Sequence, residues 1–492
     1  MFYSLDEVSA ICEGYFFYKA SDDIFNKQWK LSHIPEVVDE DTVYIPLNMI
    51  VNGDPWDTYG QIEQAIQTGA RSFLFAENFV AEEKHKEILF DMIQKYKSVL
   101  KFVMIVKGTT RQALEKLAIY TRNTKISPNT KIIAITGTMG KTSTTEMVYS
   151  ILTQSHSCYR GRPTLNVRFI NNHKFLEVDK DYDYLLFECS GAVKGYLKYF
   201  SELLRPDGAI VTKIAIENIK VYDSLINIAR NKASIMYSMT KDAVAVVDDD
   251  KFLKEPASWY KPRIIFSSGK DYELVSMEKT GSRFIYKGIE YSLPVVGYHQ
   301  IENAIKAIEL TKALGISDND IVKGLAAFEQ VGFRWEADEY ENNVHFVTDC
   351  PNPPNYDNIM SNIRIFFDLY KDAPVKRICL SKIEFLEHYE YEIYRKIAKH
   401  IIERKFDEVI LIGEDCGQLA YHIQNNSDIK VTFFDHIKKL DKDEPLIKYL
   451  IDTLDYPQAM LFKTRMMAPG DIPYGFVRNI IRHELYNRLI NK

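Results

Sequence analysis

A glycine-rich turn between an apolar strand and a helix carries the residues with the clearest chemistry. The apolar run at 132–135 predicts a buried strand, and Gly137 and Gly140 let the next residues turn tightly, so that backbone N–H groups face phosphate oxygens. The helix after the turn points the positive end of its dipole at the same place. Lys141 would then reach the outer phosphates, and the Thr142 hydroxyl would ligate Mg²⁺. An ordinary glycine turn without a ligand is the alternative.

The turn does not follow the full GxxxxGK[ST] pattern, because Ile135 stands where the first glycine would be. The sequence TGTMGKTS instead resembles the ATP site of the Mur ligase family. Those enzymes join a carboxylate to an amine through an acyl phosphate. The resemblance implies a site for ATP and Mg²⁺ that is lined by Gly137, Thr138, Met139, Gly140, Lys141, Thr142 and Ser143.

Alternating strand-like and helix-like segments must position this turn. The 492 residues leave room for about three domains of about 150 residues, and the alternation predicts an α/β fold with mostly parallel sheets. The polar segment 123–131 is the best linker. Strands are predicted at 42–46, 72–76, 184–189, 209–212, 243–247, 263–266, 344–348, 375–380, 408–412 and 430–434, and helices at 224–239, 302–314 and 318–328.

Three consecutive α/β domains match the layout of the Mur ligases, and most closely that of the members that add a dipeptide. The resemblance implies a substrate-anchoring domain at 1–127, a central P-loop ATPase domain at 128–336, and a Rossmann-like domain at 337–492 that binds the amine.

Two charged residues outside the turn are candidates for the same site. Glu188 ends a predicted strand, and ligands of α/β sheets gather at the carboxyl ends of strands, so we expect Glu188 to ligate Mg²⁺ together with Thr142. A strand-end acid that caps the next helix is the alternative. Lys232 resembles a Mur lysine that is carbamylated in many members and reaches the metal region, whereas an ordinary lysine on a helix surface would leave the same pattern.

Further site residues follow from the resemblance alone. His299 and Asn303 match a motif whose histidine and asparagine lie near the nucleotide in the family. As an alternative, Asn303 could simply be a polar residue near the start of a helix. Arg334 takes the place of a hinge arginine that contacts the terminal phosphate on closure, and Asp349 matches the aspartate of the D-Y-x-H-x-P motif. The implied catalytic set is Lys141, Glu188, Lys232, Arg334 and Asp349, and the implied metal ligands are Thr142, Glu188 and Asn218.

Several departures from the family pattern concern the second metal ion and the amine. Lys213 and Asn218 stand where the family has an asparagine and a histidine that hold a second Mg²⁺. Lys382 replaces an acid beside the incoming amine, which reverses the local charge, and the segment 349–354 keeps only the aspartate and the last proline of its motif. This pattern suggests that the ATP chemistry is kept while the amine acceptor has changed.

Charge and composition exclude several other classes of protein. The formal charge of −6 gives no electrostatic reason to expect nucleic acid, and no apolar run approaches the roughly 20 residues of a membrane helix. The six cysteines form no CxxC pair and fit core positions better than disulfides or metal ligands. Acidic residues occupy the N-terminus where a signal peptide would be basic, so we expect a cytoplasmic protein.

These patterns together predict an ATP- and Mg²⁺-dependent ligase that forms an amide between a small-molecule carboxylate, such as a UDP-linked muramyl peptide, and an amino-acid or peptide amine. Two alternatives stay open: the same chemistry on substrates outside peptidoglycan, and a degenerate nucleotide-binding regulatory protein. A monomer or a small homo-oligomer is expected. The sequence leaves open the two substrates, the number of Mg²⁺ ions and the carbamylation of Lys232.

Overall fold

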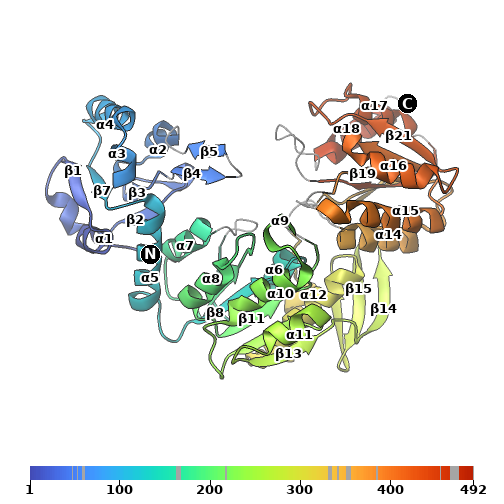
Figure 1. Ribbon diagram of the computed structural model, residues 1–492, viewed down its shortest axis with the longest axis horizontal. Coiled ribbons are helices and arrows are strands. Elements are labelled where there is room, and N and C mark those ends of the chain that lie inside the picture. Colours follow the sequence, from blue (N-terminus) through green and yellow to red (C-terminus); the bar gives the residue numbers. More distant parts are fainter. Residues whose placement is uncertain are drawn as a thin grey trace. The chain divides into compact units, whose positions relative to one another are not determined.

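The computed structural model describes residues 1–46, 48–51, 54–57, 61–161, 168–216, 219–330, 335–340, 343–350, 356–383, 386–454, 456–465 and 476–490. The chain forms two compact units, whose helices and strands are labelled in Figure 1. The first unit contains Met1–Ala134, His156–Ser190 and Tyr196–Asp207, and the second contains Ile135–Ser155, Gly191–Gly195 and Gly208–Lys492.

A five-stranded sheet with the strand order β1-β7-β6-β3-β2 forms the core of the first unit. β1 runs antiparallel to β7, and the other neighbours are parallel. Every residue of β6 and β7 is buried, as expected for parallel strands whose two faces are both covered. The elements are α1 (Leu5–Cys12), β1 (Tyr15–Lys19), β2 (Lys30–Ser32), β3 (Thr42–Tyr44), β4 (Asn48–Val51), β5 (Asp54–Asp57), α2 (Ile62–Thr68), β6 (Ser72–Ala76), α3 (Glu77–Val80), α4 (Glu83–Tyr96), β7 (Phe102–Val106) and α5 (Thr110–Thr124).

The central sheet has the strand order β13-β12-β11-β8-β10-β9, and β8 passes from the first unit into the second between Ala134 and Ile135. Its strands carry the phosphate loop and the residues predicted around it. The elements are β8 (Lys131–Thr136), α6 (Lys141–Leu152), β9 (Cys158–Arg160), α7 (Arg168–Glu177), β10 (Tyr184–Glu188), α8 (Tyr196–Leu204), β11 (Gly208–Val211), α9 (Ile219–Tyr222), α10 (Leu225–Ala233), β12 (Val244–Asp248), α11 (Lys251–Ala257), β13 (Arg263–Ser267), α12 (Tyr298–Ala313) and α13 (Asp318–Ala326).

A small antiparallel sheet of three strands lies between β13 and α12 in the sequence. It consists of β14 (Glu273–Glu278), β15 (Gly281–Tyr286) and β16 (Ile289–Leu293), which follow one another as hairpins. The sequence analysis did not predict this sheet. β15 and β16 alternate buried with more exposed residues, and β14 has no buried residue. None of the three has a long apolar run, so they lack the signal that identified the buried parallel strands.

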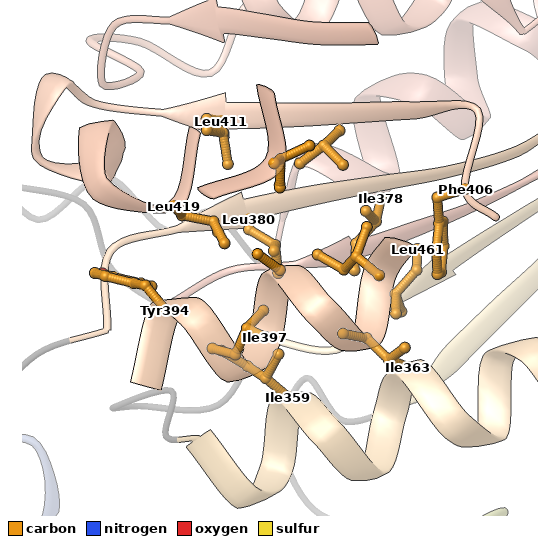
Figure 2. Packing of buried hydrophobic residues seen from close by; sticks show 14 of the residues in the cluster. Ile359, Ile363, Ile378, Leu380, Tyr394, Ile397, Phe406, Leu411, Leu419 and Leu461 are labelled. Carbon is orange, nitrogen blue, oxygen red and sulfur yellow. The ribbon is translucent and has the colours of Figure 1, made fainter. Parts of the chain in front are cut away.

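The C-terminal sheet has six strands in the order β17-β18-β22-β19-β20-β21, and only the edge strand β17 is antiparallel to its neighbour among the described pairs. Figure 2 shows one of its two cores, a single cluster that contains Ile363 of α14, Ile397 of α15 and Leu411 of β20. The elements are β17 (Glu336–Tyr340), β18 (Val344–Thr348), α14 (Tyr356–Tyr370), β19 (Lys376–Ser381), α15 (Glu390–Glu403), β20 (Glu408–Ile412), α16 (Gly417–Gln424), β21 (Lys430–Phe434), α17 (Pro445–Thr453), β22 (Gln458–Lys463) and α18 (Val477–Ile490).

Side chains of successive residues in this sheet go to opposite faces, as the pleat requires. Val409 and Leu411 join the core under α14 and α15, whereas Ile410 and Ile412 join the core that contains residues of α17 and α18. The C-terminal third is therefore a parallel sheet between two helical layers, as the sequence predicted.

Most predicted strands are confirmed within one or two residues. The helix predicted at 302–314 begins earlier, at Tyr298, and the one predicted at 224–239 ends as an α-helix at Ala233 before a short 3₁₀ turn. All six cysteines are free and buried, as expected for core residues. In the described part of the chain, no helix is both long enough and apolar enough to cross a membrane.

Candidate nucleotide-binding site

The glycine-rich turn after β8 is built against the end of β11. Gly137 has φ +141°, and a Cβ at this position would clash with the Thr212 hydroxyl. The N–H groups of Thr138 and Met139 donate to the Lys213 carbonyl at 3.0 and 3.3 Å. The turn is therefore fixed by backbone hydrogen bonds to the neighbouring strand, and glycine is required at 137 for the close approach.

The helix α6 begins directly at the end of this turn. Gly140 is its N-cap residue, with φ +79°, and Lys141, Thr142 and Ser143 form its first turn. The first N–H groups of a helix have no partner inside the helix, and the helix dipole adds positive potential there. Lys141 Nζ donates to the carbonyls of Gly137 and Thr138 at 3.0 and 2.9 Å, so its ammonium group lies over the turn. This arrangement suits a phosphate group.

The helix α12 brings Asn303 to the turn, as predicted. A Cβ at Gly140 would clash with the Asn303 amide, so the two residues lie against each other. His299, one turn earlier on α12, has its Nδ1 at 3.0 Å from the Ser361 hydroxyl of α14. Asn303 thus lies against the turn, while His299 contacts α14.

Lys213 connects the turn to α14 through its side chain. Its carbonyl accepts from the turn, and its Nζ forms an ion pair with Asp357 Oδ1 at 2.8 Å. Burial works against the charge of Lys213, but Asp357 more than offsets this, so the pKa of Lys213 is raised. Sequence reasoning treated Lys213 only as a replaced family residue, because 144 positions separate it from Asp357.

Glu188 is the last residue of β10, and it is buried with 7% of its surface exposed. The prediction that it ends a strand is confirmed. A carboxylate and a threonine hydroxyl are oxygen donors of the kind that Mg²⁺ prefers, so the chemistry of Glu188 and Thr142 fits this ion. Among the described residues, no group of three or more His, Cys, Asp or Glu side chains could hold a metal ion. That Glu188 ligates a metal ion stays a prediction.

Lys232 lies on α10 and is buried, with 2% of its surface exposed. The alternative of a surface lysine is therefore wrong. A long cationic side chain is rarely buried unless it has a structural or chemical part to play.

Asp349 follows β18 and is held in a buried cluster. Its Oδ2 forms an ion pair with Lys463 Nζ at 2.6 Å and accepts from the Asn362 amide, and its Oδ1 accepts from the Trp335 N–H at 3.0 Å. Trp335 has φ +40°, a strained value for a residue other than glycine. Asp349 therefore fixes the first described residue after the predicted hinge arginine, and Lys463 in turn holds Asp349.

Two predicted site residues, Asn218 and Arg334, lie outside the described residues, as does Glu217. Their expected contacts with metal and phosphate stay predictions.

Comparison with known proteins finds a family model that matches the central part of the chain. Residues 135–311 match the model of the Mur ligase middle domain. The curated UDP-N-acetylmuramoyl-tripeptide–D-alanyl-D-alanine ligase of Borreliella burgdorferi is 28% identical over 293 residues, which cover 58% of this chain and 62% of that protein. The match thus spans less than two thirds of the length of this relative.

Solved structures extend the likeness to the whole fold. A crystal structure of MurF from Acinetobacter baumannii has a TM-score of 0.76 at 20% identity and covers 99% of both chains. The MurF ligase of Thermotoga maritima in complex with ADP has a TM-score of 0.70 at 17% identity and covers 94% of this chain and 98% of that one. The predicted fold class is confirmed: residues 135–311 match the model of the Mur ligase middle domain, and the chain has the fold of the MurF structures along nearly its whole length.

Proposed function

We propose that this chain is an ATP-dependent ligase that forms an amide bond between a carboxylate and an amine, with a UDP-linked muramyl peptide or a similar precursor as the carboxylate. One observation carries the proposal: a Mur ligase middle domain whose phosphate turn has Lys141 and Thr142 in the first turn of α6. The matched relative is named as a ligase, and one matched structure holds ADP.

The reaction would proceed in two steps. A carboxylate oxygen attacks the γ-phosphorus of ATP, ADP leaves, and an acyl phosphate forms. The amine nitrogen then attacks the acyl carbon, the tetrahedral intermediate collapses, and inorganic phosphate leaves with the electron pair of the broken C–O bond.

Phosphoryl transfer depends on positioning and on neutralising negative charge. Lys141 would supply a positive charge at the outer phosphates, and the N–H groups at the start of α6 would bind the others. Bound Mg²⁺, held by Thr142, Glu188 and Asn218, would neutralise further charge on the phosphates. Lys232 is proposed to act near this Mg²⁺ site. Asn303, which lies on α12, would support the phosphate turn through its contact with Gly140.

Arg334 is proposed to contact the terminal phosphate when the domains close and exclude water from the acyl phosphate. Asp349 would act through position: it binds the Trp335 N–H one residue after Arg334 and is itself held by Lys463. The proposed domains keep the boundaries 1–127, 128–336 and 337–492.

Replacement of Lys141 by alanine tests the proposal directly. We expect Lys141→Ala to lose ATP-dependent amide formation by at least two orders of magnitude, because the outer phosphates lose their fixed cation. Lys131→Ala, at the exposed opposite end of β8, is the matched control and should keep full activity. Mass spectrometry of products with UDP-linked and other carboxylates gives the readout, and near-normal condensation by Lys141→Ala would refute the mechanism.

The same assay separates the two alternatives. Condensation with carboxylates that carry no UDP-linked peptide would favour a pathway outside peptidoglycan. ADP binding without turnover on any pair would favour the regulatory nucleotide-binding protein. The phosphate turn with its lysine and the buried acid Glu188 argue for catalysis, because binding alone has less need of both.

A further inference from the structure

A small cavity lies between two helices of the first unit, α5 and α8 (Figure 1). It is lined by residues between positions 119 and 123, near the end of α5, and by residues between 199 and 205, in the second half of α8 and just after it. Its volume is about 260 Å³. Because pockets for drug-sized ligands usually measure about 300–1,000 Å³, this cavity has room only for a small molecule.

Two arginines line the cavity, Arg122 of α5 and Arg205, which follows α8. Arg122 Nε donates to the Leu204 carbonyl at 3.1 Å, and Arg205 Nη2 donates to Asn123 Oδ1. Each arginine thus reaches from its own helix to the other one. Within the described part of the chain, these are the side-chain hydrogen bonds of the two arginines, and neither forms an ion pair. Since a guanidinium group has five N–H donors, both arginines have donors left for a ligand.

The electrostatic environment of Arg122 favours an anion. Burial and the nearby charge of Arg205 lower the pKa of Arg122, and the carboxylate of Asp207 offsets them only in part. Asp207 Oδ2 also accepts from the Ile132 N–H at 2.8 Å, at the start of β8. The positive charge of Arg122 is therefore incompletely compensated, and a negative group beside the two arginines would remove an unfavourable interaction.

The backbone of Arg205 points to a role for its side chain. Arg205 has φ +47°, a conformation that residues other than glycine rarely adopt, and its N–H donates to the Ser201 carbonyl at 2.8 Å. Glycine is the common residue after a helix that ends in this way, because it adopts a positive φ without strain. Arg205 is exposed, so core packing does not offset the strain. Strain of this kind gathers at ligand sites.

Two guanidinium groups indicate which class of anion fits. One planar guanidinium group can bind both oxygens of a carboxylate, whereas two such groups from different helices can share an anion with three terminal oxygens, such as a phosphate group. The rest of the lining includes the apolar side chains of Ile119 and Leu203 and the ring of Tyr199. A short carbon body can therefore pack beside the phosphate group.

We propose that this cavity binds a small phosphate monoester, whose phosphate group pairs with Arg122 and Arg205 and whose carbon body lies against Ile119, Tyr199 and Leu203. None of the lining residues belongs to the phosphate turn after β8. The proposal therefore does not depend on the ligase activity.

Titration calorimetry with glycerol 3-phosphate tests the site. The full chain is saturated with ADP to occupy the phosphate turn, and glycerol and inorganic phosphate are titrated in parallel. We expect saturable binding of glycerol 3-phosphate at millimolar concentration or below, weaker binding of inorganic phosphate and no binding of glycerol. No saturation with glycerol 3-phosphate, or equally tight binding of glycerol or of inorganic phosphate, would overturn the inference.

Replacement of the two arginines localises the binding. Arg122→Met should weaken the binding of glycerol 3-phosphate at least tenfold, because charge-assisted hydrogen bonds are lost. Arg205→Gly should weaken it as much and also raise the melting temperature, since glycine relieves the positive φ. Unchanged binding in either variant would contradict the proposal. So would a lower melting temperature of Arg205→Gly, because weaker binding could then follow from a damaged fold.

Glu202 gives the test a sign. It is an exposed carboxylate in the lining and should repel a phosphate group, so Glu202→Gln should tighten the binding of glycerol 3-phosphate. If Glu202→Gln weakened the binding as much as Arg122→Met, the cavity would not select an anion and the inference would fall.

Two further variants serve as controls. Arg111→Met removes a cation from the first turn of the same helix, where Arg111 pairs with Glu115 away from the cavity, and should leave the binding unchanged. Lys141→Ala should also bind glycerol 3-phosphate normally. If Lys141→Ala abolished this binding, the phosphate turn would hold the ester and the inference would fail, whereas the ligase proposal is judged by condensation alone.

Discussion

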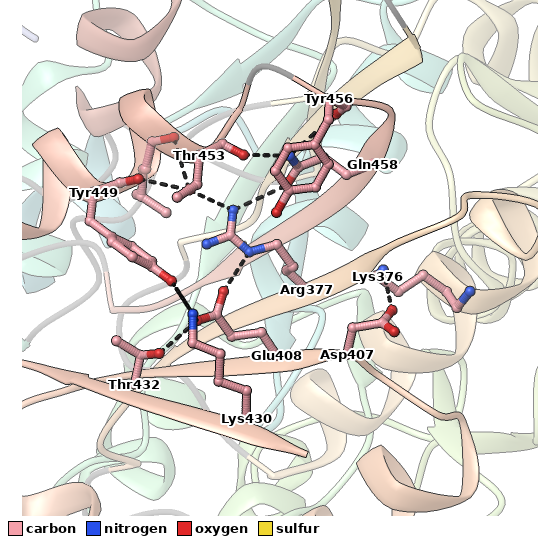
Figure 3. Close-up of polar contacts among 11 residues, drawn as sticks. Lys376, Arg377, Asp407, Glu408, Lys430, Thr432, Tyr449, Thr453, Tyr456 and Gln458 are labelled. Carbon is pink, nitrogen blue, oxygen red and sulfur yellow. Dashed lines mark hydrogen bonds and ion pairs between the residues drawn. The ribbon is translucent and has the colours of Figure 1, made fainter. Parts of the chain in front are cut away.

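The two edges of the C-terminal sheet carry similar residue types in opposite circumstances. At the amino edge, Arg377 and Glu408 form a buried ion pair at 2.7 Å, with 1% and 7% of their side-chain surfaces exposed (Figure 3). Thr453 and Gln458 accept from Arg377 at 2.8 and 3.0 Å. At the carboxyl edge, Lys382, Asp415, His436 and Arg465 form a second group, the carboxyl-edge cluster, in which the neighbouring polar atoms are 3.5–3.9 Å apart. The side chains of Lys382, Asp415 and His436 are about one third exposed.

Glu408 has further partners at the amino edge of the sheet. Glu408 Oε1 accepts from Thr432 and Tyr449 at 2.6 Å each and pairs with Lys430 at 2.8 Å. A buried carboxylate with this many donors is satisfied inside the protein and has no capacity for a ligand. The comparison teaches that short and buried ion pairs hold the fold together, whereas longer and partly exposed ones contribute little to its stability.

The largest effect is expected at the amino edge. Arg377→Met leaves the Glu408 carboxylate buried without its guanidinium partner and should destabilise the C-terminal sheet by about 3–5 kcal/mol. Hydrogen exchange of the β20 amides measures this locally. The double variant Arg377→Met/Glu408→Leu should recover part of the loss, because no buried charge is then left unpaired. A small loss in Arg377→Met would show that the two edges do not differ.

A pH series sharpens the same contrast. Burial alone would raise the pKa of Glu408, but hydrogen bonds from Lys430, Thr432 and Tyr449 and the charge of Arg377 lower it to about 2. A folded pKa below the unfolded one stabilises the protein above the unfolded pKa of about 4.3 and loses that stabilisation as the pH falls towards 2. The difference in unfolding free energy between the natural chain and Glu408→Gln should be constant above pH 5 and shrink below it.

The smallest effect on stability is expected at the carboxyl edge. Asp415→Asn should change the free energy of unfolding by less than about 1 kcal/mol, because its partners are distant and partly exposed. A stability loss comparable to that of Arg377→Met would instead assign the carboxyl-edge cluster to the fold.

The sequence predicted the parts of the molecule whose signals are local. Buried parallel strands such as 408–412 are short apolar runs, and the phosphate turn follows from glycine and lysine spacing within ten residues. β22 was missed although it is buried along its whole length, and its place between β18 and β19, far from it in sequence, could not be read from its own segment. Pairing across such separations leaves no local pattern.

The candidate site shows the same division between local and non-local signals. The turn itself was predictable, and the family resemblance supplied Asn303. The Lys213–Asp357 pair joins the segment after β11 to the helix α14 and could not be read from either segment. The burial of Lys232 was equally invisible, because a helix with mixed polar and apolar residues does not reveal which face is covered. The roles of Asn218 and Arg334 remain predictions.

The contact between Gly140 and the Asn303 amide has a consequence for how this protein can vary. Any side chain at 140 would need the space that the amide occupies, and a larger residue at 303 would press on the turn. The two positions are therefore expected to change together or not at all. In a library randomised at both, the surviving pairs should couple glycine at 140 with a residue of asparagine size at 303, so that the evolutionary freedom of each site is set by the other.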